Sequence, residues 1–134
     1  MTTTTISVSR DVSAATAVQR ALIVEDEPGI GELLAQIIKR RGFKVYSARD
    51  GDEAVRLARA ISPDLVTLDL NLPVKDGHSV LREFALDPRT SRIPVIVVSA
   101  HCGQLRPAGQ VVGVLQKPFD IHELEDAITI ATMH

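Results

Sequence analysis

The sequence predicts an α/β protein built on a doubly wound sheet of five parallel strands, and two observations carry this prediction. Short apolar runs alternate with amphipathic segments of helical period along most of the 134-residue chain. The runs are apolar at successive positions, which is typical of strands buried on both faces of a parallel sheet. A chain of this length accommodates one such domain.

The five predicted strands are short, and each is bounded by a turn or a helix start. They cover residues 21–24, 43–48, 65–68, 94–98 and 111–115. Strands that alternate with helices form right-handed crossovers. We therefore expect the flavodoxin-like strand order 2-1-3-4-5, in which the first and third strands lie at the centre of the sheet.

Four predicted helices connect or follow these strands. The first begins at Pro28, ends before Gly42 and has one apolar face: Ile30, Leu33, Leu34, Ile37 and Ile38. The second covers residues 50–61, and the third is seeded by Val80, Leu81 and Phe84 and stops near Pro88. Asp120 is a suitable N-cap for the last helix, which runs to about residue 131.

The connection between the fourth and fifth strands departs from this regular pattern. Residues 101–110 include Gly103, Pro107 and Gly109, which oppose a continuous helix. We predict at most one helical turn here, so that the fourth helix of the fold is shortened or absent.

The chain divides into two parts, of unequal size. Residues 1–19 are rich in Thr and Ser and are expected to form a flexible N-terminal extension, followed by one domain over residues 20–134. The extension lacks the apolar core of a secretion signal, and no apolar run approaches 18 residues, so we expect a cytoplasmic protein without a membrane span.

The composition excludes several classes of function. Seventeen acidic residues against 15 basic ones give a net charge of −2, which opposes nonspecific binding of nucleic acid. Aromatic residues make up only 3%, too few for a base-stacking surface. Cys102 is the single cysteine, so an internal disulfide and a cysteine zinc site are both excluded.

Chemically active side chains follow four of the predicted strands. They are Glu25, Asp26 and Glu27 after the first strand, Asp69 after the third, Ser99 after the fourth and Lys117 after the fifth. The carboxyl ends of parallel strands share one edge of the sheet, so we expect these groups to converge. Clustered carboxylates suit Mg²⁺, an aspartate can accept a phosphoryl group, and a lysine can neutralise phosphoryl oxygens.

These motifs together resemble the receiver domain of response regulators in two-component signalling. The resemblance covers about residues 20–133 and rests on VEDEP at 24–28, TLDLNLP at 67–73 with Gly77, VSA at 98–100 and KPF at 117–119. It implies that Asp69 is the phosphoacceptor, with Lys117 and Ser99 acting on the phosphoryl group and a cis bond before Pro118. It also implies a Mg²⁺ site formed by Glu25, Asp26, Asp69 and the backbone carbonyl of Asn71.

The resemblance further implies the kind of partner. A sensor histidine kinase or a histidine phosphotransfer protein would supply the phosphoryl group, and a downstream protein target or a second copy of the chain would respond to it. No direct contact with nucleic acid or membrane is expected, and the chain would catalyse only its own Mg²⁺-dependent phosphorylation and dephosphorylation.

Two features differ from the pattern of this family. Val114 stands three residues before Lys117, where receivers usually carry Tyr or Phe. Ser99 and Lys117 are also closer in sequence than usual, by about one helical turn. We therefore predict that a partner binds a reshaped output surface. His101, two residues past Ser99, is a candidate to influence access of water to the acyl phosphate.

Two other functions remain open at this stage. A degenerate receiver would act as a phosphorylation-independent interaction module, which the missing aromatic ring and the altered fourth helix favour. A Mg²⁺-dependent phosphohydrolase is the second alternative, but it needs a second acid near its nucleophile, and Leu70, Asn71 and Leu72 follow Asp69.

Overall fold

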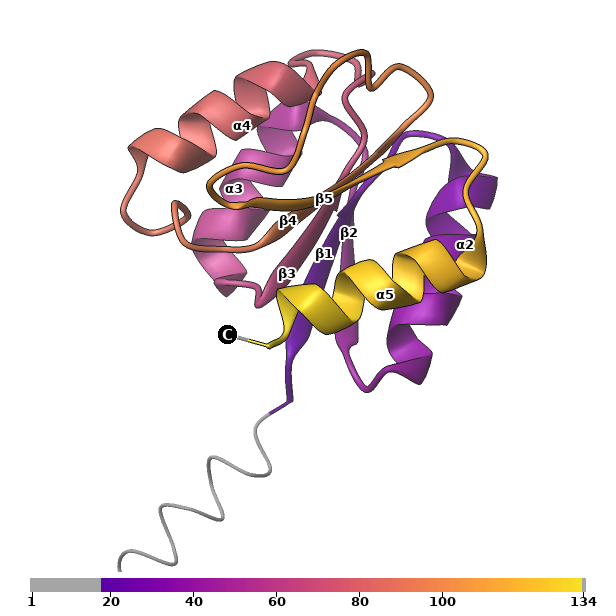
Figure 1. Ribbon diagram of the computed structural model, residues 1–134. Helices are drawn as coiled ribbons and strands as arrows, with labels where there is room; N and C mark the ends of the chain where they lie inside the picture. Colours follow the sequence, from indigo (N-terminus) through magenta and orange to yellow (C-terminus); the bar gives the residue numbers. More distant parts are fainter. Residues whose placement is uncertain (1–17, 134) are drawn as a thin grey trace, which may run out of the picture.

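The computed structural model describes residues 18–133, which form a five-stranded parallel sheet in the order β2-β1-β3-β4-β5 (Figure 1). The strands are β1 (Arg20–Val24), β2 (Lys44–Ala48), β3 (Leu65–Leu68), β4 (Val95–Ser99) and β5 (Val111–Gln116). The predicted fold class and strand order are confirmed. The predicted N-terminal extension lies almost wholly outside the described residues.

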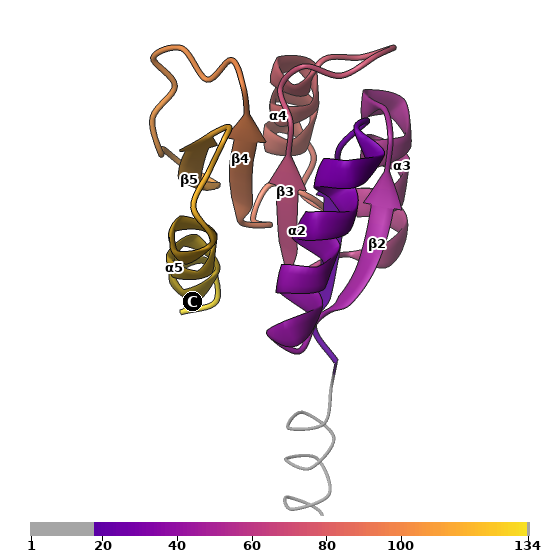
Figure 2. The same cartoon turned by 90° about the vertical axis from the view of Figure 1, so that its right-hand side faces the viewer.

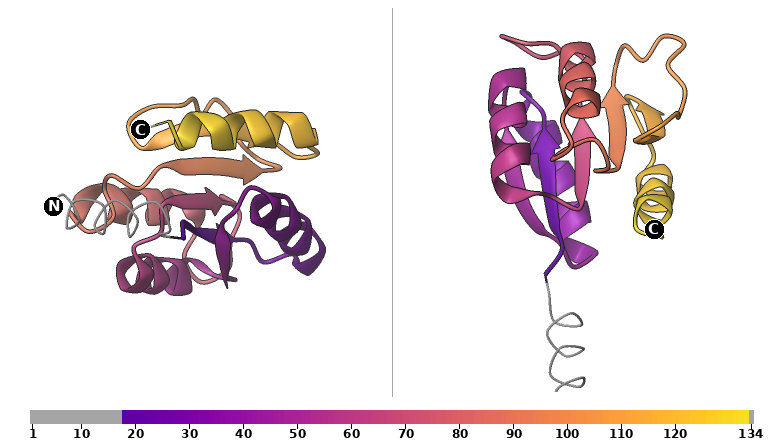
Figure 3. Two further views of the ribbon diagram at one scale, coloured as in Figure 1. Left: turned by 90° about the horizontal axis from the view of Figure 1, so that it is seen from below. Right: turned by 90° about the vertical axis from the view of Figure 1, so that its left-hand side faces the viewer.

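Helices cover both faces of the sheet (Figures 2 and 3). They are α2 (Pro28–Arg40), α3 (Gly51–Ile61), α4 (Gly77–Leu86) and α5 (Ile121–Ala131). Apolar residues of α3 and α4 pack on one face, around Phe84, and those of α2 and α5 pack on the other, around Ile38 and Leu124. None of these described helices is long and apolar enough to cross a membrane.

Local side-chain caps fix where three of the helices begin. Asp50, Asp76 and Asp120 each stand at an N-cap and accept a hydrogen bond from a backbone amide of the first turn. The N-cap of α2 is Glu27, whose side chain makes no such bond. The start of α2 therefore lacks the cap that the other helices have.

The segment between β4 and β5 contains turns but no helix in the described chain (Figure 1). Cys102 is buried in the α3 and α4 side of the core, and its Sγ lies 3.3 Å from the carbonyl oxygen of Ser99. Leu105 packs partly against the same core. The prediction that this helix is shortened or absent is confirmed, and a few anchoring side chains take its place.

Some details of the predicted elements were wrong. The third helix, for which only the seed residues and the end were predicted, begins at Gly77, because Asp76 caps it. Leu33, predicted to lie on the buried face of the first helix, is 40% exposed. It lies at the edge of that face, where it lines a shallow groove together with Ile121. The third strand has the predicted bounds, and the remaining strand and helix ends differ from prediction by at most two residues.

Candidate functional site

Acidic and basic side chains meet at the carboxyl edge of the sheet. Val24 and Leu68 are paired in register at the ends of the adjacent strands β1 and β3. The next residue of each strand, Glu25 and Asp69, is therefore carried to the same place. Sheet hydrogen bonds continue past the strand ends, since the Asp69 amide donates to the carbonyl oxygen of Val24 at 3.0 Å.

The Lys117 ammonium lies at the centre of this group. Its Nζ is 2.8 Å from Glu25 Oε1, 3.1 Å from Asp69 Oδ2 and 3.2 Å from Glu27 Oε1. The side chains of Lys117, Glu25 and Asp69 are 10%, 1% and 5% exposed, whereas that of Glu27 is 63% exposed. One buried cation thus faces two buried carboxylates and one carboxylate in contact with water.

Asp69 is also held by groups on its other side. The backbone amide of Asn71 donates to Asp69 Oδ1 at 3.0 Å. Ser99 ends β4, is fully buried and interacts through its hydroxyl with Asp69. The amide of His101 donates to Ser99 Oγ at 3.3 Å. The serine hydroxyl therefore connects the site to the helix-free segment after β4.

Burial and hydrogen bonding shift the ionisation of the buried groups. Burial raises the pKa of Glu25, an effect that hydrogen bonding to Lys117 opposes without cancelling. Burial also acts to raise the pKa of Asp69, but hydrogen bonds from Asn71, Ser99 and Lys117 outweigh it, so this pKa is lowered. Burial acts to lower the pKa of Lys117, but Glu25 and Asp69 raise it well above its usual range. Lys117 and Asp69 are therefore charged at neutral pH.

The donor set at this edge fits a hard divalent cation. Oxygens of Glu25, Glu27 and Asp69 lie within 4.8 Å of one another. Glu25 Oε1 is buried, and the Lys117 ammonium, 2.8 Å away, is its partner among the described residues. Three carboxylates against one lysine leave excess negative charge, which a cation with oxygen ligands would relieve.

The other predicted site residues lie at the rim. Asp26 and Asn71 are exposed, and the Asp26 side chain forms no hydrogen bond or ion pair with the described residues. Glu27 was expected to converge with the other strand-end groups, but it was not among the predicted metal ligands or given a contact with Lys117. Its position directly after Asp26 gave no signal of this role, because an acid there also suits an ordinary helix start.

Two glycines shape the loop that follows Asp69. A Cβ atom on Gly77 would lie 2.5 Å from the Leu70 Cα and 2.6 Å from the Asp69 carbonyl oxygen, so only glycine lets α4 begin so close to the site. A Cβ atom on Gly51 would meet the carbonyl oxygen of Lys75 at 2.0 Å. Between them, exposed Val74 has a φ of 69°, unusual for a β-branched residue.

The peptide bond between Lys117 and Pro118 is cis, as predicted. Three residues earlier, Val114 is partly buried and packs on the α3 and α4 side of the core. The position where receivers usually carry an aromatic ring is thus occupied by a small aliphatic side chain that contributes to the core.

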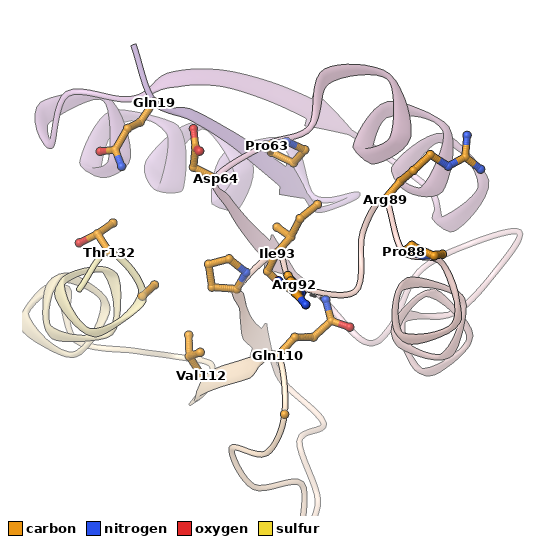
Figure 4. Close-up of a pocket in the computed structure, with 13 residues that line it drawn as sticks. Gln19, Pro63, Asp64, Pro88, Arg89, Arg92, Ile93, Gln110, Val112 and Thr132 are labelled. Carbon is orange, nitrogen blue, oxygen red and sulfur yellow. Dashed lines mark hydrogen bonds between the residues drawn. The ribbon is translucent and has the colours of Figure 1, made fainter. Parts of the chain in front are cut away.

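A cavity of about 450 Å³ lies at the opposite, amino-terminal edge of the sheet (Figure 4). Two of its charged groups have partners: Asp64 accepts from the backbone amide of Arg20 at 2.8 Å, and Arg89 pairs with Asp87 at 2.9 Å. The amide group of Gln110 donates to the carbonyl oxygens of Thr90 and Ile93. These polar groups hold strand ends and turns together, and the chemistry resides at the other edge.

Comparisons with known proteins agree with this geometry. Residues 21–129 match the family model of the response regulator receiver domain. The chain is 37% identical over 110 residues to the DNA-binding dual master transcriptional regulator RpaA of Synechocystis sp., covering 78% of the chain but only 45% of that regulator. It is 28% identical over 112 residues to sporulation initiation phosphotransferase F of Bacillus subtilis, covering 82% of the chain and 90% of that protein.

A solved structure with similar coverage is the receiver domain of sensor histidine kinase PA1611 from Pseudomonas aeruginosa. It has a TM-score of 0.75 and 30% identity, over 86% of this chain and 98% of that one, and it holds a magnesium ion in its active-site cleft. The chain therefore belongs to the response regulator receiver domain family. Receiver domains are signalling domains rather than typical enzymes, and they interact with histidine kinases or phosphotransfer proteins.

Proposed function

We propose that this chain accepts a phosphoryl group on Asp69 from a histidine kinase or a histidine phosphotransfer protein and thereby changes its affinity for a protein partner. The observation that carries this proposal is the buried Asp69 carboxylate, with Lys117 Nζ 3.1 Å from one oxygen and the Asn71 amide 3.0 Å from the other. An ion pair that served only stability would not require two further carboxylates around the same lysine.

The proposed reaction is a single displacement at phosphorus. An oxygen of ionised Asp69 attacks the phosphorus atom of a phosphohistidine, the P–N bond breaks, and its electron pair remains on the imidazole nitrogen. The lowered pKa of Asp69 keeps this oxygen unprotonated at neutral pH. Lys117 and the Ser99 hydroxyl would stabilise the phosphoryl oxygens.

A divalent cation is part of this proposal, with Mg²⁺ as the expected ion. Glu25, Asp26, Asp69 and the backbone carbonyl of Asn71 would hold it, and the close approach of the Glu25 and Asp69 carboxylates to each other supports the fit. When bound, Mg²⁺ supplies positive charge against the phosphoryl oxygens. Asp26 is exposed and free of competing contacts among the described residues, so its side chain can turn toward the ion at little cost.

The proposed output passes through Ser99. Its oxygen accepts from the His101 amide at 3.3 Å, and its O–H would donate to a phosphoryl oxygen on Asp69, which would draw the hydroxyl toward the site. A shift of Ser99 would then move the segment over residues 100–110, to which it is directly joined. A partner would therefore bind a surface made of this segment rather than a regular helix, and Val114 would replace the usual aromatic reporter.

Mass spectrometry of the intact protein tests the proposal. The chain is incubated with Mg²⁺ and acetyl phosphate, and we expect one phosphoryl adduct, absent in Asp69→Ala and retained in the control Asp126→Ala, an exposed acid on α5. No adduct on the wild-type chain would refute the proposal. Slower or faster loss of the adduct in His101→Ala would show that this residue controls access of water, and an unchanged rate would exclude that role.

A second candidate function is that of a phosphorylation-independent interaction module. Val114 in place of an aromatic residue and the helix-free connection over residues 100–110 favour it, because both alter the surface through which receivers usually signal. This alternative predicts equal partner binding by the wild-type chain and by Asp69→Ala, with or without a phosphodonor.

A further inference from the structure

Glu27 occupies the N-cap of α2 without acting as a cap. Its backbone is extended, with φ −88° and ψ 113°, as a cap requires, but its side chain accepts no hydrogen bond from the amides of α2. The first turn of α2 also contains no acidic residue. Asp50, Asp76 and Asp120 all cap their helices, so the same backbone position is used differently in α2.

The Glu27 carboxylate reaches into the candidate site instead. Its Oε1 lies 3.2 Å from Lys117 Nζ, across 90 residues of sequence. Its backbone amide donates to Glu25 Oε2 at 3.2 Å, which anchors the start of α2 to the buried acid. The Glu27 side chain is long enough to contact Lys117, and it makes this contact instead of capping α2. A shorter aspartate at the same position would favour the cap.

The three carboxylates around Lys117 differ in their freedom to move. Glu25 and Asp69 are almost fully buried, and removing either from the lysine would leave a buried charge without a partner. Glu27 is 63% exposed, so its carboxylate can leave the lysine and be hydrated at once. Glu27 is therefore the one partner of the three that Lys117 can exchange easily.

We propose that Glu27 is a positioning residue that holds Lys117 in the resting site and gives it up when Asp69 is phosphorylated. This inference rests on the proposed function. Each phosphoryl oxygen that approaches Lys117 competes with the Glu27 carboxylate for the same ammonium protons. Glu27 thus opposes formation of the phosphorylated state, and its removal shifts the chain toward that state.

Two substitutions separate this role from a structural one. Glu27→Gln removes the charge, while Glu27→Asp keeps the charge but shortens the side chain and favours capping of α2. Because an exposed ion pair contributes up to about 1 kcal/mol, we expect both variants to be phosphorylated by acetyl phosphate about two- to fivefold faster at saturating Mg²⁺. Glu32→Gln, an exposed acid on α2, is the control for loss of charge alone.

The ¹⁵N resonance of the Lys117 ammonium provides a readout that helix stability does not move. We expect it to shift in Glu27→Gln and Glu27→Asp, but not in Glu32→Gln, in the absence of any phosphodonor. The inference would be overturned if both Glu27 variants kept the wild-type phosphorylation rate and the wild-type Lys117 resonance. It would also be overturned if Glu32→Gln changed the rate and the resonance as much as the Glu27 variants do. A rate difference that disappears when Mg²⁺ is saturating would assign Glu27 to the metal and overturn it too. If no variant forms an adduct, the proposed function fails, and the resonance still decides whether Glu27 holds the lysine.

Discussion

The substitution Lys117→Met tests how strongly the buried charges of the site depend on one another. Lys117 lies within 3.1 Å of both Glu25 and Asp69, whose side chains are at most 5% exposed. Methionine fills a similar volume but carries no charge. The variant therefore leaves two buried carboxylates side by side, with Glu27 as a third carboxylate nearby.

The expected loss of unfolding free energy in Lys117→Met depends on the burial of the two carboxylates and on whether Glu25 can bind a proton. Removing one partner of a buried ion pair costs roughly 3–5 kcal/mol when the other charge has to stay. Glu25 can instead bind a proton, and burial already raises its pKa above the ordinary value of 4.5. Protonation at pH 7 then costs less than roughly 3.5 kcal/mol, at about 1.4 kcal/mol per pH unit. We expect a loss of about 2–3 kcal/mol of unfolding free energy at pH 7, without metal.

The loss should depend on pH with a definite sign. A raised pKa means that Glu25 favours folding fully below pH 4.5, and that this contribution is lost as the pH rises through the folded pKa. Without Lys117 the folded pKa of Glu25 rises further. Asp69, with its lowered pKa, contributes stability above its ordinary value of 3.8, and the variant loses part of that contribution. The deficit of Lys117→Met should therefore grow from pH 5 to pH 7.

Urea denaturation followed by circular dichroism measures this deficit, with EDTA present at both pH values. Lys75→Met is the matched control, because Lys75 also contacts two acids, Asp52 and Glu83, but does so at the surface. It should cost clearly less and show no comparable growth with pH. Equal stability of Lys117→Met and the wild-type chain at pH 7, or a deficit that stays constant from pH 5 to pH 7, would refute the reasoning.

Three further substitutions test the packing around the site by the same denaturation assay. The Thr67 hydroxyl is buried and has no hydrogen-bond partner among residues 18–133, so Thr67→Val should raise the free energy of unfolding by about 1 kcal/mol, and a decrease would show that the hydroxyl is bonded. Val74→Asn should also raise the free energy of unfolding by about 1 kcal/mol, because Val74 is 78% exposed and has a positive φ that Asn tolerates better. An unchanged free energy of unfolding would show that this turn is unstrained. Gly77→Ala should lower the free energy of unfolding by about 2 kcal/mol and slow phosphorylation of Asp69, because the alanine Cβ would collide with Leu70. Wild-type stability of this variant would contradict the close approach of α4 to Leu70.

The fold was readable from the sequence because its signals are local and repeated. Apolar runs such as residues 65–68 mark buried strands, and Pro28, Asp50 and Asp120 mark helix starts. Gly103, Pro107 and Gly109 correctly indicated that no regular helix precedes β5. What the sequence could not indicate was how the core fills that gap, since burial of Cys102 depends on contacts across the sheet.

The site was readable only in part, for a similar reason. Strand ends indicated that Glu25, Asp69 and Lys117 would lie at one edge, because parallel strands bring their carboxyl ends together. The choice between Asp26 and Glu27 depends on which side chain turns inward from the start of α2. That choice follows from the reach of a glutamate to a lysine 90 residues away, and no periodic pattern records it.

The helix-free connection between β4 and β5 also has a mechanical consequence. It must return from the carboxyl end of β4 to the amino end of β5, about 17–20 Å for strands of this length. Residues 100–110 reach at most roughly 40 Å when fully stretched, about twice that distance. The connection therefore has about half of its full length to spare. It tolerates added residues, whereas removal of more than about five residues would pull the edge strand, and Lys117 at its end, away from the sheet.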